Sequence, residues 1–250
     1  MTGVDLLILA LTGVAAGIVS TVASLASVVS YPVLLALGLP PLSANVTNTF
    51  SLMFTGIGAA AGSRPELAGQ GRLIRRLGPV AAAGGAAGAA LLLALPARTF
   101  EYVAPMLIGG GSLVLLLRPE QDISRPQAHR DTSPFLIAVT FCVSAYVGYF
   151  GAAGGILLLA VLTSMLSQSL ARTNAVKNVL SGAANGVAAV AFAIFGPVRW
   201  AAVAPLAAGF LLGGWIGPKL VRRLPARLLR IAISLAGIGL AIRLGLSAYG

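Results

Sequence analysis

Long apolar, nearly uncharged runs constrain this chain more than any other feature of its sequence. Eight runs follow one another, at residues 6–39, 42–62, 77–97, 102–117, 134–171, 179–198, 200–218 and 228–248. A helix needs about 20 apolar residues to cross the hydrocarbon core of a bilayer, and most of these runs fit one crossing. Only 9% of the residues are charged, too few to cover a water-facing surface. We therefore expect an all-α polytopic membrane protein and exclude a soluble enzyme or binding module.

The few charges are strongly biased towards the basic residues. Lys and Arg number 17 against 6 Asp and Glu, which gives a net charge of +11. In a soluble protein this balance would suggest nucleic-acid binding. Here the basic residues lie in the short gaps between apolar runs, as they do in the cytoplasmic loops of membrane proteins. We interpret the basicity as a signal of topology and expect the lipid bilayer, and no nucleic acid, as a partner.

The first and fifth runs are too long for one straight span. Each is interrupted by small residues, at 20–27 (STVASLAS) and 148–155 (GYFGAAGG). A break there would leave two arms of about 12–16 residues, which suits a re-entrant hairpin or a broken helix. Irregular backbone at membrane depth persists only where protein or a water-filled cavity surrounds it.

The two halves of the chain resemble each other. Each begins with a long broken run, continues with a polar cluster and ends with three single spans; residues 44–48 (ANVTN) correspond to 174–178 (NAVKN). We expect a first membrane repeat at 1–118, a polar cytoplasmic linker at 119–133 and a second membrane repeat at 134–250.

Charge placement distinguishes parallel repeats from inverted ones. If each long run crosses once, the basic clusters at 64–76 and 219–230 fall on opposite sides of the membrane. If each long run returns to its own side, both clusters, the linker and Arg172 share one face. Because basic loops are cytoplasmic, we expect two inverted repeats, each a re-entrant hairpin followed by three transmembrane helices, with both termini outside.

Lys177 is the charged residue most deeply embedded in an apolar context. Asn174, Lys177 and Asn178 are spaced so that they project from one face of a helix. An ammonium and two amides form a donor-rich set suited to an oxyanion, and an ionisable residue within a membrane segment is a candidate functional residue. The alternative is a lysine whose charge reaches the cytoplasmic interface beside Arg172.

The first half carries a similar polar face. Asn45, Asn48 and Thr49 share one side of a helix that would start at Pro40-Pro41. Ser43 or Asn45 could instead cap that helix start, and both roles are compatible because a helix start binds anions. Two polar helix starts and two broken hairpins predict a substrate site at the membrane midplane.

Small and aromatic residues at the breaks complete the predicted site. We include Ser24 and Ser27 at the first break and Gly154 and Gly155 at the second, where backbone N–H groups can line a cavity. Tyr149 would line a pore or lie at the membrane interface. The GxxxG pairs elsewhere are expected to pack helices closely.

Catalytic chemistry has little support. The acidic residues lie mostly at ends and in loops, and the chain has one cysteine, Cys142, and one histidine, His129. No nucleophile–base pair and no metal cluster can be assembled from these residues. We expect no enzyme activity, no catalytic residues, no metal and no cofactor.

Three segments of the chain resemble one transporter family. They are residues 34–50 (LLALGLPPLSANVTNTF), 146–159 (YVGYFGAAGGILLL) and 172–182 (RTNAVKNVLSG), and together they resemble the TauE/SafE family of sulfite exporters and toluene-sulfonate uptake permeases. The resemblance implies a multi-pass transporter of the bacterial inner membrane for small sulfur-containing or organic anions. The family's first break is usually glycine-rich, whereas serine hydroxyls stand there in this chain.

The expected function is therefore a permease that moves small anions, such as sulfite or organosulfonates, by alternating access around a midplane site. A non-transporting membrane scaffold or assembly factor is the alternative, and a dry, fully packed centre would favour it. The expected partners are a small anionic substrate and the bilayer, with a homo-oligomer as an open possibility.

Overall fold

The computed structural model describes residues 1–23, 25–96, 133–150, 154–166 and 168–221, with isolated positions between 99 and 113 and between 231 and 246. Ser24, nearly all of the expected linker at 119–133 and most of the runs at 102–117 and 228–248 lie outside the described residues.

The described part of the chain is helical and contains no strand, which confirms the all-α prediction. The helices are α1 (Gly3–Ala23), α2 (Ala26–Ala36), α3 (Pro41–Gly62), α4 (Arg64–Leu67), α5 (Gly71–Ala94), α7 (Pro134–Tyr149), α8 (Gly154–Met165), α9 (Leu170–Phe195) and α10 (Trp200–Val221). Among the described residues, four stretches are long and apolar enough to cross a membrane: Gly3–Thr21, Gly71–Ala94, Ala171–Phe195 and Trp200–Leu220.

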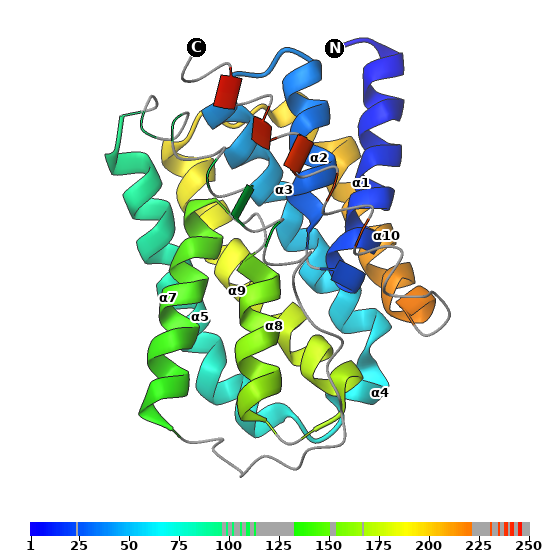
Figure 1. Cartoon of the computed structure of the whole chain (residues 1–250). Helices are drawn as coiled ribbons and strands as arrows, with labels where there is room; N and C mark the ends of the chain where they lie inside the picture. Colours follow the sequence, from blue (N-terminus) through cyan, green and yellow to red (C-terminus); the bar gives the residue numbers. More distant parts are fainter. Residues whose placement is uncertain are drawn as a thin grey trace.

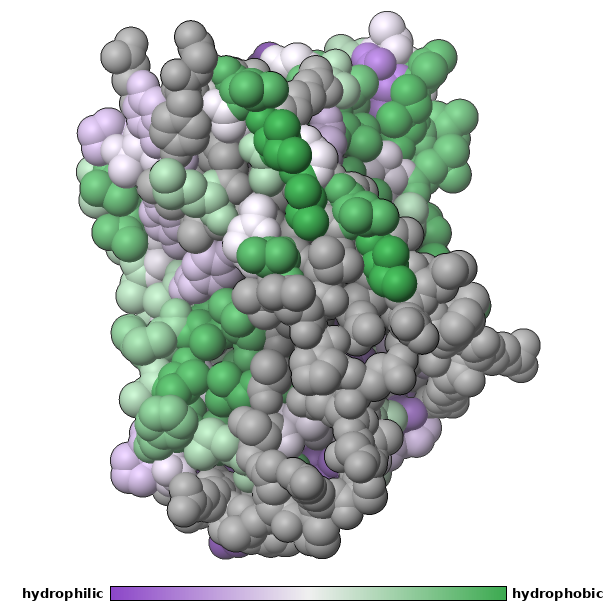
Figure 2. All heavy atoms as spheres, viewed as in Figure 1, coloured by the Kyte–Doolittle hydropathy of each residue, from purple (hydrophilic) through white to green (hydrophobic). Residues whose placement is uncertain are grey.

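Large apolar side chains cover much of the described surface. Leu7 and Leu11 on α1 and Ile194 and Phe195 on α9 are all more than half exposed. Figure 2 shows hydrophobic residues running down the face of the molecule, with hydrophilic ones gathered towards its two ends. A water-soluble monomer rarely exposes apolar surface on this scale, so these side chains face lipid.

Both predicted breaks are present. α1 ends at Ala23 and α2 begins at Ala26, while α7 ends at Tyr149 and α8 begins at Gly154. In Figure 1, α1 descends from the N-terminus and α2 returns to the same end, whereas α7 rises from the opposite end and α8 descends again. The predicted arm length is wrong for α1, which has 21 residues, because the helix begins at Gly3, before the apolar run, and continues into the small-residue stretch as far as Ala23.

The long helices pack across the two halves of the chain. α10 lies against α1 and α3, α5 lies against α7 and α9, and α3 contacts α9 between these groups. Glycines allow the close approach: a Cβ on Gly17 of α1 would lie 3.0 Å from the Cα of Gly213 on α10, and one on Gly209 would lie 2.8 Å from the Cα of Gly13. The prediction that GxxxG pairs allow close helix packing is confirmed at these positions.

The polar clusters lie within helices rather than at their starts. The N-cap of α3 is Pro40, without a side-chain hydrogen bond, and Ser169 caps α9 by accepting from the Arg172 amide. The capping role considered for Ser43 and Asn45 is therefore wrong: Pro41 occupies the first helical position, where no N–H needs a partner. Both side chains bond to residues of the other half instead.

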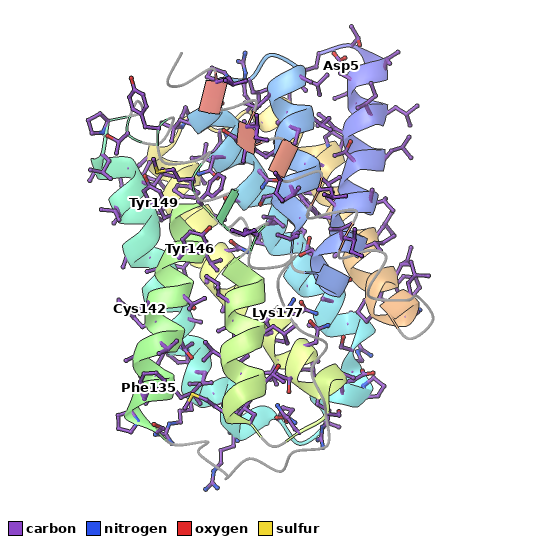
Figure 3. All side chains as sticks on the ribbon, viewed as in Figure 1. Asp5, Phe135, Cys142, Tyr146, Tyr149 and Lys177 are labelled. Carbon is purple, nitrogen blue, oxygen red and sulfur yellow. The ribbon has the colours of Figure 1, made fainter. Side chains whose placement is uncertain are left out.

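The described arginines at 64–76 and Arg172 belong to segments that meet at one end of the molecule. α4 and the first turns of α5, α7 and α9 all lie at the bottom of Figure 1, and the Arg172 guanidinium donates to the Ala68 carbonyl at 2.6 Å. Asp5 lies at the opposite end (Figure 3).

Candidate functional site

A cavity of about 40 Å³ lies in the middle of the described structure, where the breaks meet α3 and α9. One water molecule needs about 10–15 Å³ on a comparable measure, so the cavity holds a few small groups. Residues from α1, α2, α3, α7, α8 and α9 line it. Its polar lining consists of Ser20, Ser27, Thr55, Lys177, Asn178, Ser181 and Asn185.

Lys177 brings an amino group, the ionisable group of the described lining, to this cavity. Its side chain is only 2% exposed, and its Nζ donates to the carbonyl of Ser20, near the end of α1, at 3.4 Å. Carbonyls at a helix C-terminus carry partial negative charge, so the ammonium has a favourable neighbour there. Figure 3 places Lys177 at a level between Asp5 and Phe135, well away from both ends of the molecule. The interfacial alternative requires the Lys177 side chain to reach one end of the structure. In the structure the side chain lies far from both ends (Figure 3).

Two helix N-termini add to the positive potential. Ala26 and Ser27, at the start of α2, and Gly155, at the start of α8, line the cavity. The N-cap residue of α2, Leu25, has no capping side chain, so the first N–H groups of α2 have no side-chain acceptor from that position. The N-terminal turn of a helix attracts anions through such N–H groups and through the helix dipole.

Four polar atoms of cavity-lining residues have no hydrogen-bond partner: Thr55 Oγ1, Asn178 Nδ2, Ser181 Oγ and Asn185 Oδ1. Thr55, Asn178 and Asn185 are at most 7% exposed. Buried polar atoms are nearly always paired with protein, water or ligand. This cluster is therefore chemically incomplete by itself, as expected of a binding site.

The structure brings Lys177, Asn178, Ser27 and Gly155 of the predicted site together at the cavity. Asn48 does not line it, because this side chain connects α3 to α2. Its Nδ2 donates to Ser27 Oγ at 3.1 Å, and its Oδ1 accepts from Ser30 Oγ at 2.6 Å. Asn48 thus fixes the orientation of a cavity residue.

Asn45 and Asn174 bind the ends of the broken helices. Asn45 Nδ2 donates to the carbonyl of Tyr149, the last residue of α7, at 3.1 Å. Asn174 Nδ2 donates to the carbonyl of Thr21, near the end of α1, at 2.9 Å. Neither residue lines the cavity. Each connects a polar helix of one half to the break of the other half.

The remaining predicted residues are dispersed. Thr49 is buried, and its hydroxyl has no partner, but it lies outside the cavity lining. Gly154 packs closely on α7, because a Cβ there would lie 3.2 Å from the Tyr146 ring. Tyr149 accepts the Asn45 bond through its backbone and is also absent from the lining.

Sequence reasoning missed four polar residues of the lining: Ser20, Thr55, Ser181 and Asn185. The signal for two of them was present, since 174, 178, 181 and 185 follow the alternating spacing of three and four that keeps residues on one helix face. The prediction considered the polar cluster only as far as Asn178. Among the described residues no group of His, Cys, Asp or Glu could hold a metal ion.

A bundle of apolar helices around a polar central cavity defines a multi-pass membrane transporter, and the comparisons agree. The model of the sulfite exporter TauE/SafE family matches residues 9–244, so the chain belongs to this family. It is 27% identical, over 92% of its length and 88% of the relative's, to the probable membrane transporter protein ORF9 of Sinorhizobium.

Other curated relatives have similar descriptions. The chain is 25% identical to the probable membrane transporter protein YfcA of Escherichia coli, over 94% of this chain and 87% of YfcA. It is 26% identical to a probable membrane transporter protein of Haemophilus influenzae, over 88% of this chain and 86% of that protein. No solved structure matches the chain.

Proposed function

We propose that this transporter moves small anions through the central cavity by alternating access. The observation that carries the proposal is the placement of the buried Lys177 at a cavity that the N-termini of α2 and α8 also line. All three features favour negative charge. An anion here would also supply partners for the unpaired Asn178 Nδ2 and the two hydroxyls.

We also propose that the chain consists of two inverted repeats, 1–118 and 134–250, joined by a linker at 119–133. Reciprocal packing supports this proposal: α1 packs on α10 as α7 packs on α5, and α3 packs on α10 as α9 packs on α5. The opposite directions of α1 and α7 in Figure 1 are those of inverted repeats. The Asn45–Tyr149 and Asn174–Thr21 bonds are likewise counterparts.

Alternating access needs contacts at each end that can open in turn. At one end, Ser43 Oγ donates to the Pro197 carbonyl at 2.7 Å, and the Arg199 amide donates to Thr47 Oγ1 at 3.0 Å. At the other end, Gln70 Nε2 donates to Gln168 Oε1 at 2.6 Å. The Arg172–Ala68 bond lies at that second end too. These two sets are our candidates for the gates on either side of the cavity.

The basic end is proposed to face the cytoplasm, and the protein to lie in a bacterial inner membrane with both termini outside. Support comes from the arginines around α4, the start of α5 and the start of α9, which share one end.

The family description supports sulfur-containing anions such as sulfite or organosulfonates as substrates. The polar cavity argues against the scaffold alternative, because a non-transporting scaffold is expected to have a dry and fully packed centre.

Flux of sulfite into proteoliposomes tests this function. Lys177→Ala should reduce the initial rate by at least about tenfold, because it removes a charge-assisted contact in a site shielded from water. Lys219→Ala is the matched control: its Nζ lies 3.5 Å from the centroid of the Trp215 ring on α10, away from the cavity lining. This control should transport like the parent. Unchanged flux in Lys177→Ala would remove Lys177 from the mechanism, and absence of flux for every anion tested in the parent would reject the function.

A further inference from the structure

The cavity continues along α9 well beyond Lys177. Lys177 and Asn185 both line it and lie eight residues apart, which corresponds to about 12 Å along a helix axis. Side chains on a helix lean towards its N-terminus, so the Lys177 ammonium projects away from Asn185 rather than towards it. A single small inorganic anion held at Lys177 would therefore leave the polar groups at the other end of the cavity without a ligand.

The part of the cavity that lies one to two helical turns beyond Lys177 has a chemistry of its own. Thr55 from α3 and Ser181 and Asn185 from α9 contribute two hydroxyls and an amide oxygen, all without partners. Lys177 is the one ionisable residue of the described cavity lining. The Thr55–Ser181–Asn185 cluster is therefore a neutral surface that can both donate and accept hydrogen bonds.

The crossing of α3 and α9 holds this cluster in place. The helices touch at Gly56 and Gly182, where a Cβ on Gly56 would lie 2.7 Å from the Cα of Gly182. Both glycines line the cavity beside Thr55 and Ser181. Residues of both helices therefore converge at a point where the backbones cannot separate without losing this contact.

We infer that the Thr55–Ser181–Asn185 cluster is a second subsite, which binds an uncharged hydrogen-bonding group, such as a hydroxyl or a carboxamide, at the end of a short organic anion. This inference rests on the proposed function, because the anionic group of the same molecule occupies the Lys177 end. The two subsites together select a substrate that is charged at one end and polar but uncharged at the other. A substrate hydroxyl can donate to Asn185 Oδ1 and accept from the Thr55 or Ser181 hydroxyl.

Binding of two matched sulfonates to the purified full-length protein tests the inference. The probes are 2-hydroxyethanesulfonate and ethanesulfonate, which carry the same charge and differ by one hydroxyl. Isothermal titration calorimetry should show that the hydroxylated anion binds at least about tenfold more tightly than ethanesulfonate. The reason is that a site built for a hydroxyl rejects the analogue that leaves its buried groups unpaired. Equal affinities in the parent protein would overturn the subsite while leaving anion transport intact.

Variants assign the difference to the cluster. Asn185→Leu and Thr55→Val should each reduce the ratio of the two affinities towards one. Ser51→Ala is the control: this buried hydroxyl on α3 donates to the Thr47 carbonyl of its own helix and does not line the cavity. It should keep the ratio of the parent, and unfolding temperatures of all three variants exclude misfolding. A ratio that survives both cluster variants would overturn the assignment.

Two further outcomes separate the competing explanations. If neither sulfonate nor sulfite binds, the proposed function fails together with the subsite. If sulfite binding instead requires Na⁺, and Thr55→Val abolishes that requirement, the three oxygens hold a cation and the inference is wrong.

Discussion

Asn174 of the second half donates a hydrogen bond to the carbonyl of Thr21, close to where the first broken helix ends. That carbonyl belongs to the last turn of α1, which lacks the next turn of helix to donate to it. The polar cluster at residues 174–178 thus has two roles in the structure. Lys177 and Asn178 line the cavity, and Asn174 stabilises the backbone that forms its wall.

Replacing Asn174 by Leu should destabilise the protein by about 1–3 kcal/mol, the usual effect of leaving a buried carbonyl without its donor. Thermal unfolding in detergent measures the change. Ser51→Ala provides the comparison, because its hydroxyl bonds only to a carbonyl of its own helix, and its effect should be smaller. Equal effects in the two variants would show that the bond to Thr21 contributes no more to stability than a bond within a single helix.

A methyl group on Gly17 should separate α1 from α10. An alanine Cβ there would lie 2.9 Å from the backbone oxygen of Phe210 and 3.0 Å from the Cα of Gly213, so the helix backbones would have to move apart. We expect Gly17→Ala to destabilise the protein by about 1–3 kcal/mol. Gly186→Ala on α9 has nothing within 4 Å of the new methyl and should be neutral or slightly stabilising, because alanine is the better helix former. If both variants unfold alike, close glycine packing does not hold α1 on α10.

Lys177→Met should separate stability from function. Methionine keeps an unbranched apolar side chain while removing a charge that folding must bury. We expect the unfolding temperature to stay level or rise, while affinity for sulfite falls by at least about tenfold because the charged contact is lost. Stabilisation by added sulfite, measured against its concentration, reports both quantities. A large drop in unfolding temperature without ligand would instead make Lys177 a structural residue.

Labelling of single cysteines tests the proposed topology. In a Cys142→Ser background, Gly3→Cys and Gly71→Cys introduce thiols at two exposed positions where a new side chain meets nothing within 4 Å. A membrane-impermeant thiol reagent added to intact cells should label Gly3→Cys and spare Gly71→Cys until the membrane is opened. The reverse pattern would invert the orientation, and labelling of both from outside would contradict the placement of the starts of α1 and α5 at opposite ends of the molecule in Figure 1.

The sequence predicted the architecture well where the signal was compositional. Apolar runs located the helices of the described part of the chain, and clusters of small residues located both breaks within a few residues. These signals are local, because hydropathy and missing side chains act on the segment that contains them. The length of α1 was misjudged, since nothing in an apolar run marks where within a small-residue stretch the helix ends.

The site was only partly predictable. Lys177 was identifiable because a charge in an apolar context is rare. Whether a given asparagine faces the cavity or a backbone carbonyl depends on the opposing element, and that element comes from the other half of the chain. Asn45 and Asn178 illustrate this: each was predicted to bind substrate, yet Asn45 binds the end of α7 and Asn178 lines the cavity. Thr55 had no local signal, because one threonine in an apolar run usually reflects packing.

The exchange of packing partners between the halves also has a consequence for biosynthesis. α1 is made well before α10, the helix that covers its glycine face. Until α10 is made, that face lacks the helix that covers it. The first half therefore cannot complete its helix packing alone, and a fragment that ends before α10 leaves the glycine face of α1 uncovered. Conversely, two separately synthesised halves carry complementary glycine faces, on α1 and on α10, and should be able to assemble in one membrane.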